Sequence, residues 1–385
     1  MNIDLLIRGG RVIDPSRNFD AIGDVAIRNG MIVELPEGEI TASRVINAKG
    51  CLVTPGLIDF HLHIAHRSSS LALNPDTFLL PNGVTSANDV GTTGTNNCEG
   101  FLLHTARPSP LTIKCFINIL SNGVTEHCKV IDEVVQTGEE ADRIGWLLER
   151  YPDEILGVKL WSRMGGRSLE DALDLTERLG VRLCIHASDS LRDYSEVLDL
   201  LRPNDIIIHF YQNRGTNLLD ENTGKVRKAA WEAKKRGVIF DSANGRGNYA
   251  LSVVRQAISE GFLPDVISSD NTHGLTAFTE YTYALPYVMS TYMACGMSLV
   301  DVLRCVTATP AREMGMDGKI GTLRPGSRAD VTVLELDETP HMIKDFRGSE
   351  PVASKGLFMP MMTVKDGDIM HMRMDFAFLK NGISK

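Results

Sequence analysis

Five apolar stretches of the chain each end in a side chain that can bind a metal ion. The first, residues 57–63, carries two histidines separated by one residue. Side chains two positions apart on a β-strand point to the same face, so both imidazoles can share one cation. The other four stretches end in a lysine, two histidines and an aspartate. The predicted ligand set is His61, His63, Lys159, His186, His209 and Asp270.

The lysine of this set is its most informative member. Lys159 follows the apolar run Ile155–Val158, so a strand there would bury an ammonium group, which is costly unless the charge is paired or lost. Beside two cations the amine would be neutral and could take up carbon dioxide to form a carbamate that bridges them. An ion pair with Asp89 or Asp241 is the alternative for an isolated barrel lysine. The surrounding ligand-type residues favour the carbamate.

The chemistry expected of this set is hydrolysis at two divalent metal ions. The donors are nitrogen and oxygen without a thiolate, which fits zinc best and also admits manganese or iron. We expect Asp270 to bind one metal and, as general base, to take the proton of a bridging water. Two dications against a carbamate, a carboxylate and a hydroxide leave a net positive charge, which suits an anionic substrate.

Alternating strands and helices would bring these side chains to one face. Strand-like runs occur at residues 57–63, 84–90, 113–119, 155–159, 183–186, 206–209, 238–241 and 266–270. Helical patterns between them include residues 169–179, 190–201, 222–236 and 248–260. This order predicts an α/β fold, a (β/α)8 barrel of the TIM type, in which the C-terminal ends of all strands meet at the catalytic face.

Both ends of the chain have a different character, with short strands and tight turns. Asn29-Gly30 lies between two β-rich runs, which is a strong hairpin signal, and residues 330–334 and 364–369 also read as strand and hairpin. We expect the two ends to pair into a small β-sandwich module, residues 1–54 plus 318–385, beside a barrel of residues 55–317.

Composition narrows the class of protein. The 385 residues carry a formal net charge of −9 and no basic run, which argues against a nucleic-acid-binding face. No stretch approaches the 18 consecutive apolar residues of a membrane span, and the N-terminal residues lack the features of a signal peptide. Seven cysteines without a C-x-x-C pair favour reduced thiols. We expect a cytoplasmic protein, a small homo-oligomer, that acts on a small molecule.

The segment T-P-G-L-I-D-F-H-L-H at residues 54–63, with the strand lysine, the two later histidines and the final aspartate, resembles the amidohydrolase superfamily in its binuclear, carbamylated-lysine branch. Residues 318–330 resemble the return of that family into its β-sandwich. Residues 218–226, 236–241 and 261–265 are similar to its dihydroorotase-like amidohydrolase/deacetylase group. The resemblance implies deacetylation of an N-acetyl or O-acetyl carboxylic acid.

Three other functions remain open at this point. A cyclic amidase of the dihydroorotase or hydantoinase kind would share every metal ligand. A lactonase or phosphotriesterase would have a similar metal site but a pocket without arginines. An inactive scaffold would be expected to have lost ligands, and all six are present.

Some residues expected to face the substrate differ from those of the dihydroorotase-like group. Trp161 stands where the group often has an arginine, and Asn271-Thr272-His273 replaces its usual pair after the final aspartate. The predicted substrate-binding residues are Arg163, Arg167, Tyr211, Asn244, Arg246 and His273. Arginines fit a carboxylate, the tyrosine would donate to an oxyanion, the glycine-rich loop at 244–247 would offer backbone donors, and the histidine would contact the leaving group. Solvated charges, a core tyrosine and a helix cap are the structural alternatives.

Overall fold

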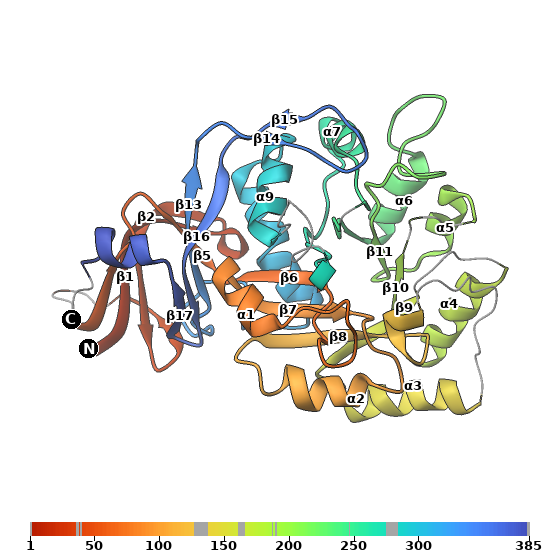
Figure 1. Cartoon of the computed structure of the whole chain (residues 1–385), viewed down its shortest axis with the longest axis horizontal. Coiled ribbons are helices and arrows are strands. Elements are labelled where there is room, and N and C mark those ends of the chain that lie inside the picture. Colours follow the sequence, from red (N-terminus) through yellow and green to blue (C-terminus); the bar gives the residue numbers. More distant parts are fainter. Residues whose placement is uncertain are drawn as a thin grey trace.

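The computed structural model describes residues 2–35, 38, 41–126, 138–160, 166–186, 188, 191–245, 247–274 and 284–382. Two sheets organise the chain (Figure 1). One is the parallel sheet that carries the predicted ligands, and the other is a mixed sheet in which both chain ends lie.

The parallel sheet has seven strands, which lie side by side in sequence order from β6 to β12. Its strands are β6 (Leu57–Leu62), β7 (Val84–Val90), β8 (Thr112–Asn118), β9 (Ile155–Leu160), β10 (Arg182–His186), β11 (Ile206–Ile208) and β12 (Ile239–Asp241). All residues of β6, β7 and β11 are buried. Burial on both faces explains why these strands read as continuous apolar runs. Seven of the eight predicted barrel strands are confirmed.

The eighth predicted strand, residues 266–270, is not a regular strand. Its pairing with β12 is a single parallel bridge between Asp241 and Val266. On its other side the Asp270 amide donates to the carbonyl of His61 at 2.7 Å, and the His63 amide donates to Asn271 at 3.0 Å. The segment therefore connects β12 with β6 and completes a TIM-like ring without forming a full ladder.

Two serines explain why this segment leaves strand geometry. The Ser268 hydroxyl donates to Asp241 Oδ1 and the Ser269 hydroxyl donates to Asp59 Oδ2, both at 2.5 Å. Asp59 also accepts the Ser269 amide at 3.0 Å. Hydrogen bonds of this kind, from short polar side chains and to buried carboxylates, compete with the backbone ladder of a sheet.

Helices surround the parallel sheet (Figure 1). They are α1 (Pro75–Leu79), α2 (Cys98–Phe101), α3 (Glu139–Arg150), α4 (Ser168–Arg178), α5 (Tyr194–Leu200), α6 (Lys228–Arg236), α7 (Leu251–Ser259), α9 (Leu285–Ala294), α10 (Leu299–Cys305) and α11 (Ala308–Glu313). Helices α4 to α7 fall within or next to the four predicted segments. None of the helices in the described part of the chain is long and apolar enough to cross a membrane.

Helix α6 begins six residues later than its predicted segment, at Lys228. The preceding residues form a tight turn, in which the Asp220 amide donates to Lys225 at 2.8 Å. The Asp220 carboxylate accepts the backbone amides of Asn222 and Thr223. This local arrangement satisfies the backbone groups that a helix would otherwise use.

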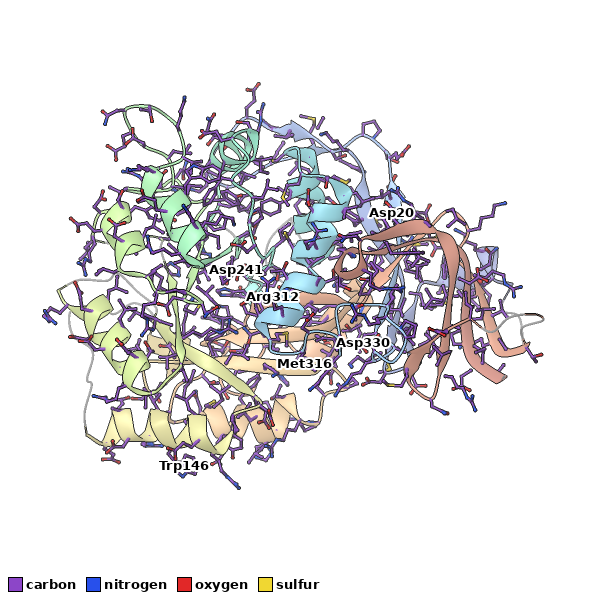
Figure 2. The ribbon with its side chains drawn as sticks, turned by 180° about the vertical axis from the view of Figure 1, so that it is seen from behind. Asp20, Trp146, Asp241, Arg312, Met316 and Asp330 are labelled. Atoms are coloured by element: carbon purple, nitrogen blue, oxygen red, sulfur yellow. The ribbon has the colours of Figure 1, made fainter. Side chains whose placement is uncertain are left out.

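The interior of the barrel is closed at the end opposite the predicted ligands. Ala311 of α11, followed by Met314, Met316 and Ile320, packs in one apolar cluster with strand residues such as Phe116. The view from behind shows Arg312 of α11 and Met316 just after it (Figure 2). The plug at this end leaves the carboxyl end of the strands as the open face.

The predicted β-module is a mixed sheet built from both chain ends, in the order β17-β16-β13-β5-β1-β2-β3, with β4 paired to β1. Its strands are β1 (Asn2–Asp14), β2 (Phe19–Arg28), β3 (Met31–Val33), β4 (Thr41–Asn47), β5 (Leu52–Pro55), β13 (Val331–Asp337), β16 (Leu357–Lys365) and β17 (Asp368–Met372). After a bulge between Ile7 and Gly10, β1 changes partner from β4 to β5. The sheet thus bends around an apolar core of its own.

Two consecutive strands of the chain, β5 and β6, belong to different sheets. β5 ends at Pro55 and β6 begins at Leu57, so a single residue separates the mixed sheet from the parallel sheet along the chain. A short two-stranded sheet, β14 (Met342–Ile343) and β15 (Val352–Ala353), lies between β13 and β16. Beside it, the Asp345 carboxylate accepts the Leu251 amide at the start of α7 at 2.6 Å, which ties this connection to the barrel.

Candidate metal centre

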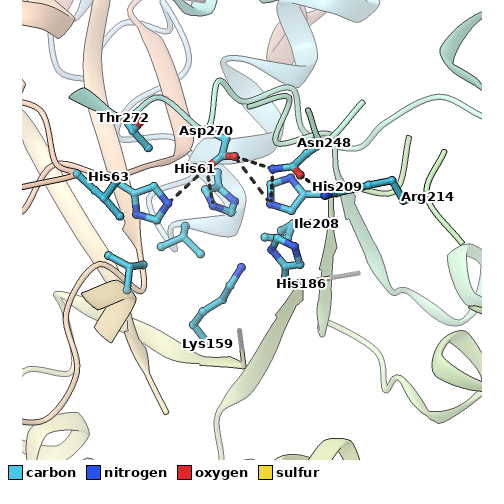
Figure 3. Close-up of a pocket in the computed structure, with 13 residues that line it drawn as sticks. His61, His63, Lys159, His186, Ile208, His209, Arg214, Asn248, Asp270 and Thr272 are labelled. Atoms are coloured by element: carbon cyan, nitrogen blue, oxygen red, sulfur yellow. Dashed lines mark hydrogen bonds and ion pairs between the residues drawn. The ribbon is translucent and has the colours of Figure 1, made fainter. Parts of the chain in front are cut away.

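One cavity at the carboxyl end of the strands gathers the predicted ligands. Its volume is ≈ 240 Å³, and its lining includes all six: His61, His63, Lys159, His186, His209 and Asp270. They come from β6 and the residue after it, from β9 and β10, from the residue after β11, and from the segment that closes the ring. The strand pairing thus brings together side chains up to 209 positions apart (Figure 3).

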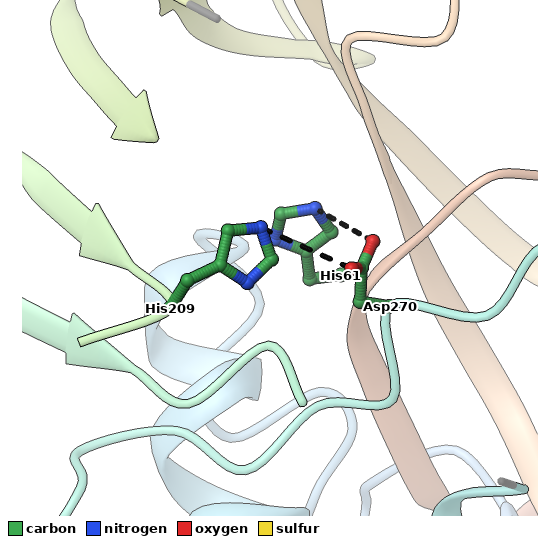
Figure 4. A group of neighbouring side chains, drawn as sticks. All are labelled: His61, His209 and Asp270. Carbon is green, nitrogen blue, oxygen red and sulfur yellow. Dashed lines mark ion pairs between the residues drawn. The ribbon is translucent and has the colours of Figure 1, made fainter. Parts of the chain in front are cut away.

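Asp270 is the point on which the imidazoles converge. Its Oδ1 lies 3.6 Å from His61 Nε2 and 3.4 Å from His63 Nε2, while its Oδ2 lies 3.9 Å from His209 Nε2. The ligand atoms of His61, His209 and Asp270 all lie within 4.8 Å of one another (Figure 4). These three buried residues form a group that can hold a metal ion.

A buried hydrogen-bond chain sets the orientation of His63. Its Nδ1 lies 2.8 Å from Thr92 Oγ1, and that hydroxyl donates to Asp89 Oδ2 at 2.8 Å. The single hydroxyl proton goes to the carboxylate, so the oxygen accepts the Nδ1 proton of the histidine. Asp89 is held in turn by the amides of Ile64 and Ala65. His63 therefore presents the lone pair of Nε2 to the cavity, as a metal ligand requires.

His209 is fixed in the same tautomer by the backbone. Its Nδ1 lies 2.5 Å from the carbonyl oxygen of Ala243, a pure acceptor, so Nδ1 carries the proton and Nε2 faces Asp270. The backbone of His209, Ala243 and Asp270 is left-handed, with φ of 59°, 38° and 50°. Such angles are unfavourable for residues other than glycine, and they gather where the surrounding structure imposes a functional geometry.

His61 has an acidic neighbour on the side away from Asp270. Its Nδ1 lies 3.5 Å from Oδ2 of Asp241. Both atoms are buried, and neither forms a hydrogen bond within the described structure. Burial raises the pKa of the Asp241 carboxyl to about 7. A small closure of this gap would give His61 the same support that the other two histidines have.

Burial favours the neutral form of three of the imidazoles, those of His61, His186 and His209. It holds the pKa of His61 and His186 well below the ordinary value and lowers that of His209 to about 3. Burial alone would raise the pKa of Asp270, but its contacts with the ring nitrogens of His63, His209 and His61 hold it well below its usual range. Neutral imidazoles beside an ionised carboxylate are the protonation states that bind a divalent cation.

Lys159 is buried, and none of the carboxylates that the structure describes forms an ion pair with it. Its Nζ contacts the Cys184 thiol at 3.8 Å, and it makes no ion pair with Asp89, Asp241 or any other carboxylate that the structure describes. Burial lowers the pKa of this amine. Gly91 makes room for it, because a Cβ there would come within 2.7 Å of Lys159 Cγ. The amine is thus placed in the cavity in a state biased toward neutrality.

A second glycine is required beside the carboxylate. A Cβ on Gly245 would lie 2.3 Å from Asp270 Oδ2, and the backbone there has φ +50°. The amides of Asn244 and Gly245 donate to Ser268 and Ser269 across the ring closure. Both amides are therefore occupied by hydrogen bonds within the fold. The prediction that this loop offers backbone donors to the substrate is wrong for these two amides.

Two predicted substrate contacts lie in the core. The Tyr211 hydroxyl donates to the carbonyl of Phe262 at 3.0 Å, and the ring packs against Phe210, so the alternative of a core tyrosine is what the structure shows. Asn244 is buried, and its Oδ1 accepts the hydroxyl of Tyr292 at 2.7 Å. Neither lines the cavity.

The other predicted contacts are peripheral or outside the described residues. Arg167 is exposed and lies 3.6 Å from Asp171 across the start of α4. His273 is exposed, and its amide donates to Leu71 at 2.6 Å. Neither lines the cavity, although Thr272 does. Arg163 and Arg246 lie outside the described residues.

Sequence reasoning missed the polar residues of the cavity wall, Arg214 and Asn248. Both lie in connections that follow strands, five residues after His209 and seven after Asp241. Their position after strand ends was the available signal, because loops at the carboxyl face of a barrel carry functional residues. No periodicity distinguishes them from other loop residues.

Comparison with known proteins identifies the family. The model of the amidohydrolase family matches residues 52–370. A deacetylase of Agrobacterium fabrum is 28% identical over 327 residues, covering 83% of this chain and 79% of the relative. A deacetylase of Enterococcus faecalis is 26% identical over 96% of this chain and 99% of its own length. A dihydroorotase of Syntrophus aciditrophicus is 22% identical over 87% and 90%.

Solved structures show the same fold. An adenine deaminase superposes with a TM-score of 0.81 at 23% identity, covering 96% of this chain and all of the other. A dihydroorotase gives 0.80 at 24%, covering 95% and 98%. The chain is a hydrolase that belongs to the amidohydrolase family, and its buried His61, His209 and Asp270 form a candidate metal site.

Proposed function

We propose that the protein hydrolyses a small N-acetyl or O-acetyl carboxylic acid with two divalent metal ions, zinc being the best fit to the donors. The observation that carries this proposal is the convergence of three imidazoles on the two oxygens of Asp270, with Lys159 and His186 lining the same cavity. The deacetylase relatives support the choice of an acetyl group.

Lys159 would complete the binuclear site as a carbamate. Its amine is buried, has a lowered pKa and lacks a described carboxylate partner. A neutral amine can add to carbon dioxide with loss of a proton, which yields an anion with two oxygen donors where four neutral imidazoles supply no charge. His61, His63 and Asp270 would hold one ion, and His186 and His209 the other.

The chain's own groups then account for the proton transfers. Bound divalent ions would polarise the scissile carbonyl and make water a nucleophile at neutral pH. Asp270 stays ionised, so it can accept the proton of the attacking water and deliver it to the leaving nitrogen or oxygen as the acyl bond breaks. The products are acetate and the free amine or alcohol. Ring opening of a cyclic amide would require the same residues, and it is the alternative reaction.

The test combines metal analysis with a substrate screen. We expect about two metal ions per chain and turnover of N-acetyl or O-acetyl acids. Asp270→Asn should lower kcat by a factor of about 10²–10⁴, the usual contribution of a general base, while Asp174→Asn on the exposed side of α4 should not. Turnover of dihydroorotate or hydantoins alone would establish the cyclic-amide alternative. Full activity of Asp270→Asn would refute the mechanism.

A further inference from the structure

The cavity has a guanidinium in its wall that the metal ligands do not explain. Arg214 follows β11 in the connection to α6, and among the described lining residues it is the one arginine. Figure 3 shows it beyond Asn248, on the side of the cavity where His186 and His209 lie. An arginine in the wall of a small catalytic cavity is well suited to a planar anion, because its fork matches a carboxylate.

Asn248 connects this arginine to the proposed base. Arg214 Nη2 donates to Asn248 Oδ1 at 2.7 Å, and Asn248 Nδ2 donates to Asp270 Oδ2 at 3.2 Å. The same Nδ2 lies 3.5 Å from His209 Nε2. These neighbours fix the orientation of the amide, since only its oxygen can accept from a guanidinium and only its nitrogen can donate to a carboxylate.

The amide thereby keeps two opposite charges apart. The amide oxygen accepts from the guanidinium and the amide nitrogen donates to the carboxylate, so one neutral group is hydrogen-bonded to both charges. The arrangement separates a carboxylate that serves the reaction from a cation that can serve the substrate.

We propose that Arg214 binds the carboxylate of the substrate and that Asn248 is the positioning residue that holds the guanidinium. This inference rests on the proposed function, because it specifies the substrate class as a small acid whose carboxylate and acyl group are close enough to reach Arg214 and the ligands together. It assigns to Arg214 the contact that the sequence suggested for Arg163, Arg167 or Arg246.

A substrate isostere that cannot be hydrolysed tests the contact by binding alone. 4-Oxopentanoate replaces the amide nitrogen of N-acetylglycine by carbon, and 4-oxopentanamide is its neutral counterpart. Calorimetric titration would compare the metal-loaded wild type with Arg214→Met and with Arg107→Met, a control at an exposed arginine paired with Glu154. We expect Arg214→Met to bind the anion about 10- to 100-fold more weakly, the value of a charge-assisted hydrogen bond or two, and to bind the amide as the wild type does.

A second variant shows whether a loss of binding reflects misfolding rather than loss of the contact. Arg214→Lys keeps the charge and loses the fork, so it should weaken binding of the anion by a smaller factor. Unchanged affinity of both variants for 4-oxopentanoate would overturn the proposal, as would an equal loss for anion and amide. If the wild type hydrolyses no acetylated acid but still discriminates anion from amide through Arg214, the proposed reaction fails and the carboxylate site stands.

Discussion

The hydrogen-bond chain behind His63 gives the sharpest prediction from this structure. Thr92→Val removes one hydroxyl at nearly constant volume. That hydroxyl accepts from His63 Nδ1 and donates to Asp89 Oδ2, each at 2.8 Å, and both partners are largely buried. Asp89 keeps the amides of Ile64 and Ala65, so the loss falls mainly on the histidine. We expect the free energy of unfolding to decrease by about 1–3 kcal/mol.

The same substitution should weaken metal binding by about 10- to 100-fold, because support of a ligand's second nitrogen commonly contributes that much. That factor corresponds to about 1.4–2.7 kcal/mol, the range expected of one or two hydrogen bonds. Competition with a chelator would measure the affinity. Thr93→Val is the matched control, since the neighbouring Thr93 is equally buried and its hydroxyl has no hydrogen bond in the described structure. Equal metal affinities for the two variants would refute the reasoning.

Two other predictions use the same site. In the metal-free protein, the depressed pKa of His209, about 3, means that the unfolded chain binds more protons than the fold between about pH 6.5 and pH 3, so this residue costs stability as the pH falls. Replacing it in His209→Asn should reduce the pH slope of unfolding by about 1.4 kcal/mol per unit near pH 5, and equal slopes would contradict the assignment. Gly245→Ala should displace Asp270 and abolish turnover, whereas Gly247→Ala, with nothing within 4 Å of its Cβ, should be active.

The ligand set could be predicted from the sequence because of how a parallel barrel buries its strands. β9 and β10 are enclosed by helices outside and by the barrel core inside, so each reads as an apolar run. A polar residue where such a run stops must lie at the carboxyl face. Lys159 and His186 follow this rule, and both line the cavity at the carboxyl face.

The same rule failed where strand geometry did not persist. Val266 and Ile267 read as a buried strand, but hydrogen bonds of Ser268 and Ser269 with distant carboxylates turn the segment away from its ladder. Tyr211, two residues after His209, was expected to donate to an oxyanion, which requires strand alternation to carry its side chain to the cavity. β11 ends at Ile208, however, and the left-handed backbone of His209 ends the alternation. Neither the distant carboxylate partners of the two serines nor the backbone conformation of His209 has a signal in the local sequence.

Substrate recognition is the part that a sequence pattern cannot supply. His61 lies in β6 and His63 directly follows that strand, whereas Arg214 and Asn248 are placed by connections whose course depends on the rest of the fold. A metal-binding ring of this kind can therefore stay constant while the connections change the charge that faces the substrate. For this chain we propose that the charge facing the substrate is that of Arg214, which lines the cavity. Its loss should convert a cavity selective for acids into one that no longer distinguishes an acid from its amide.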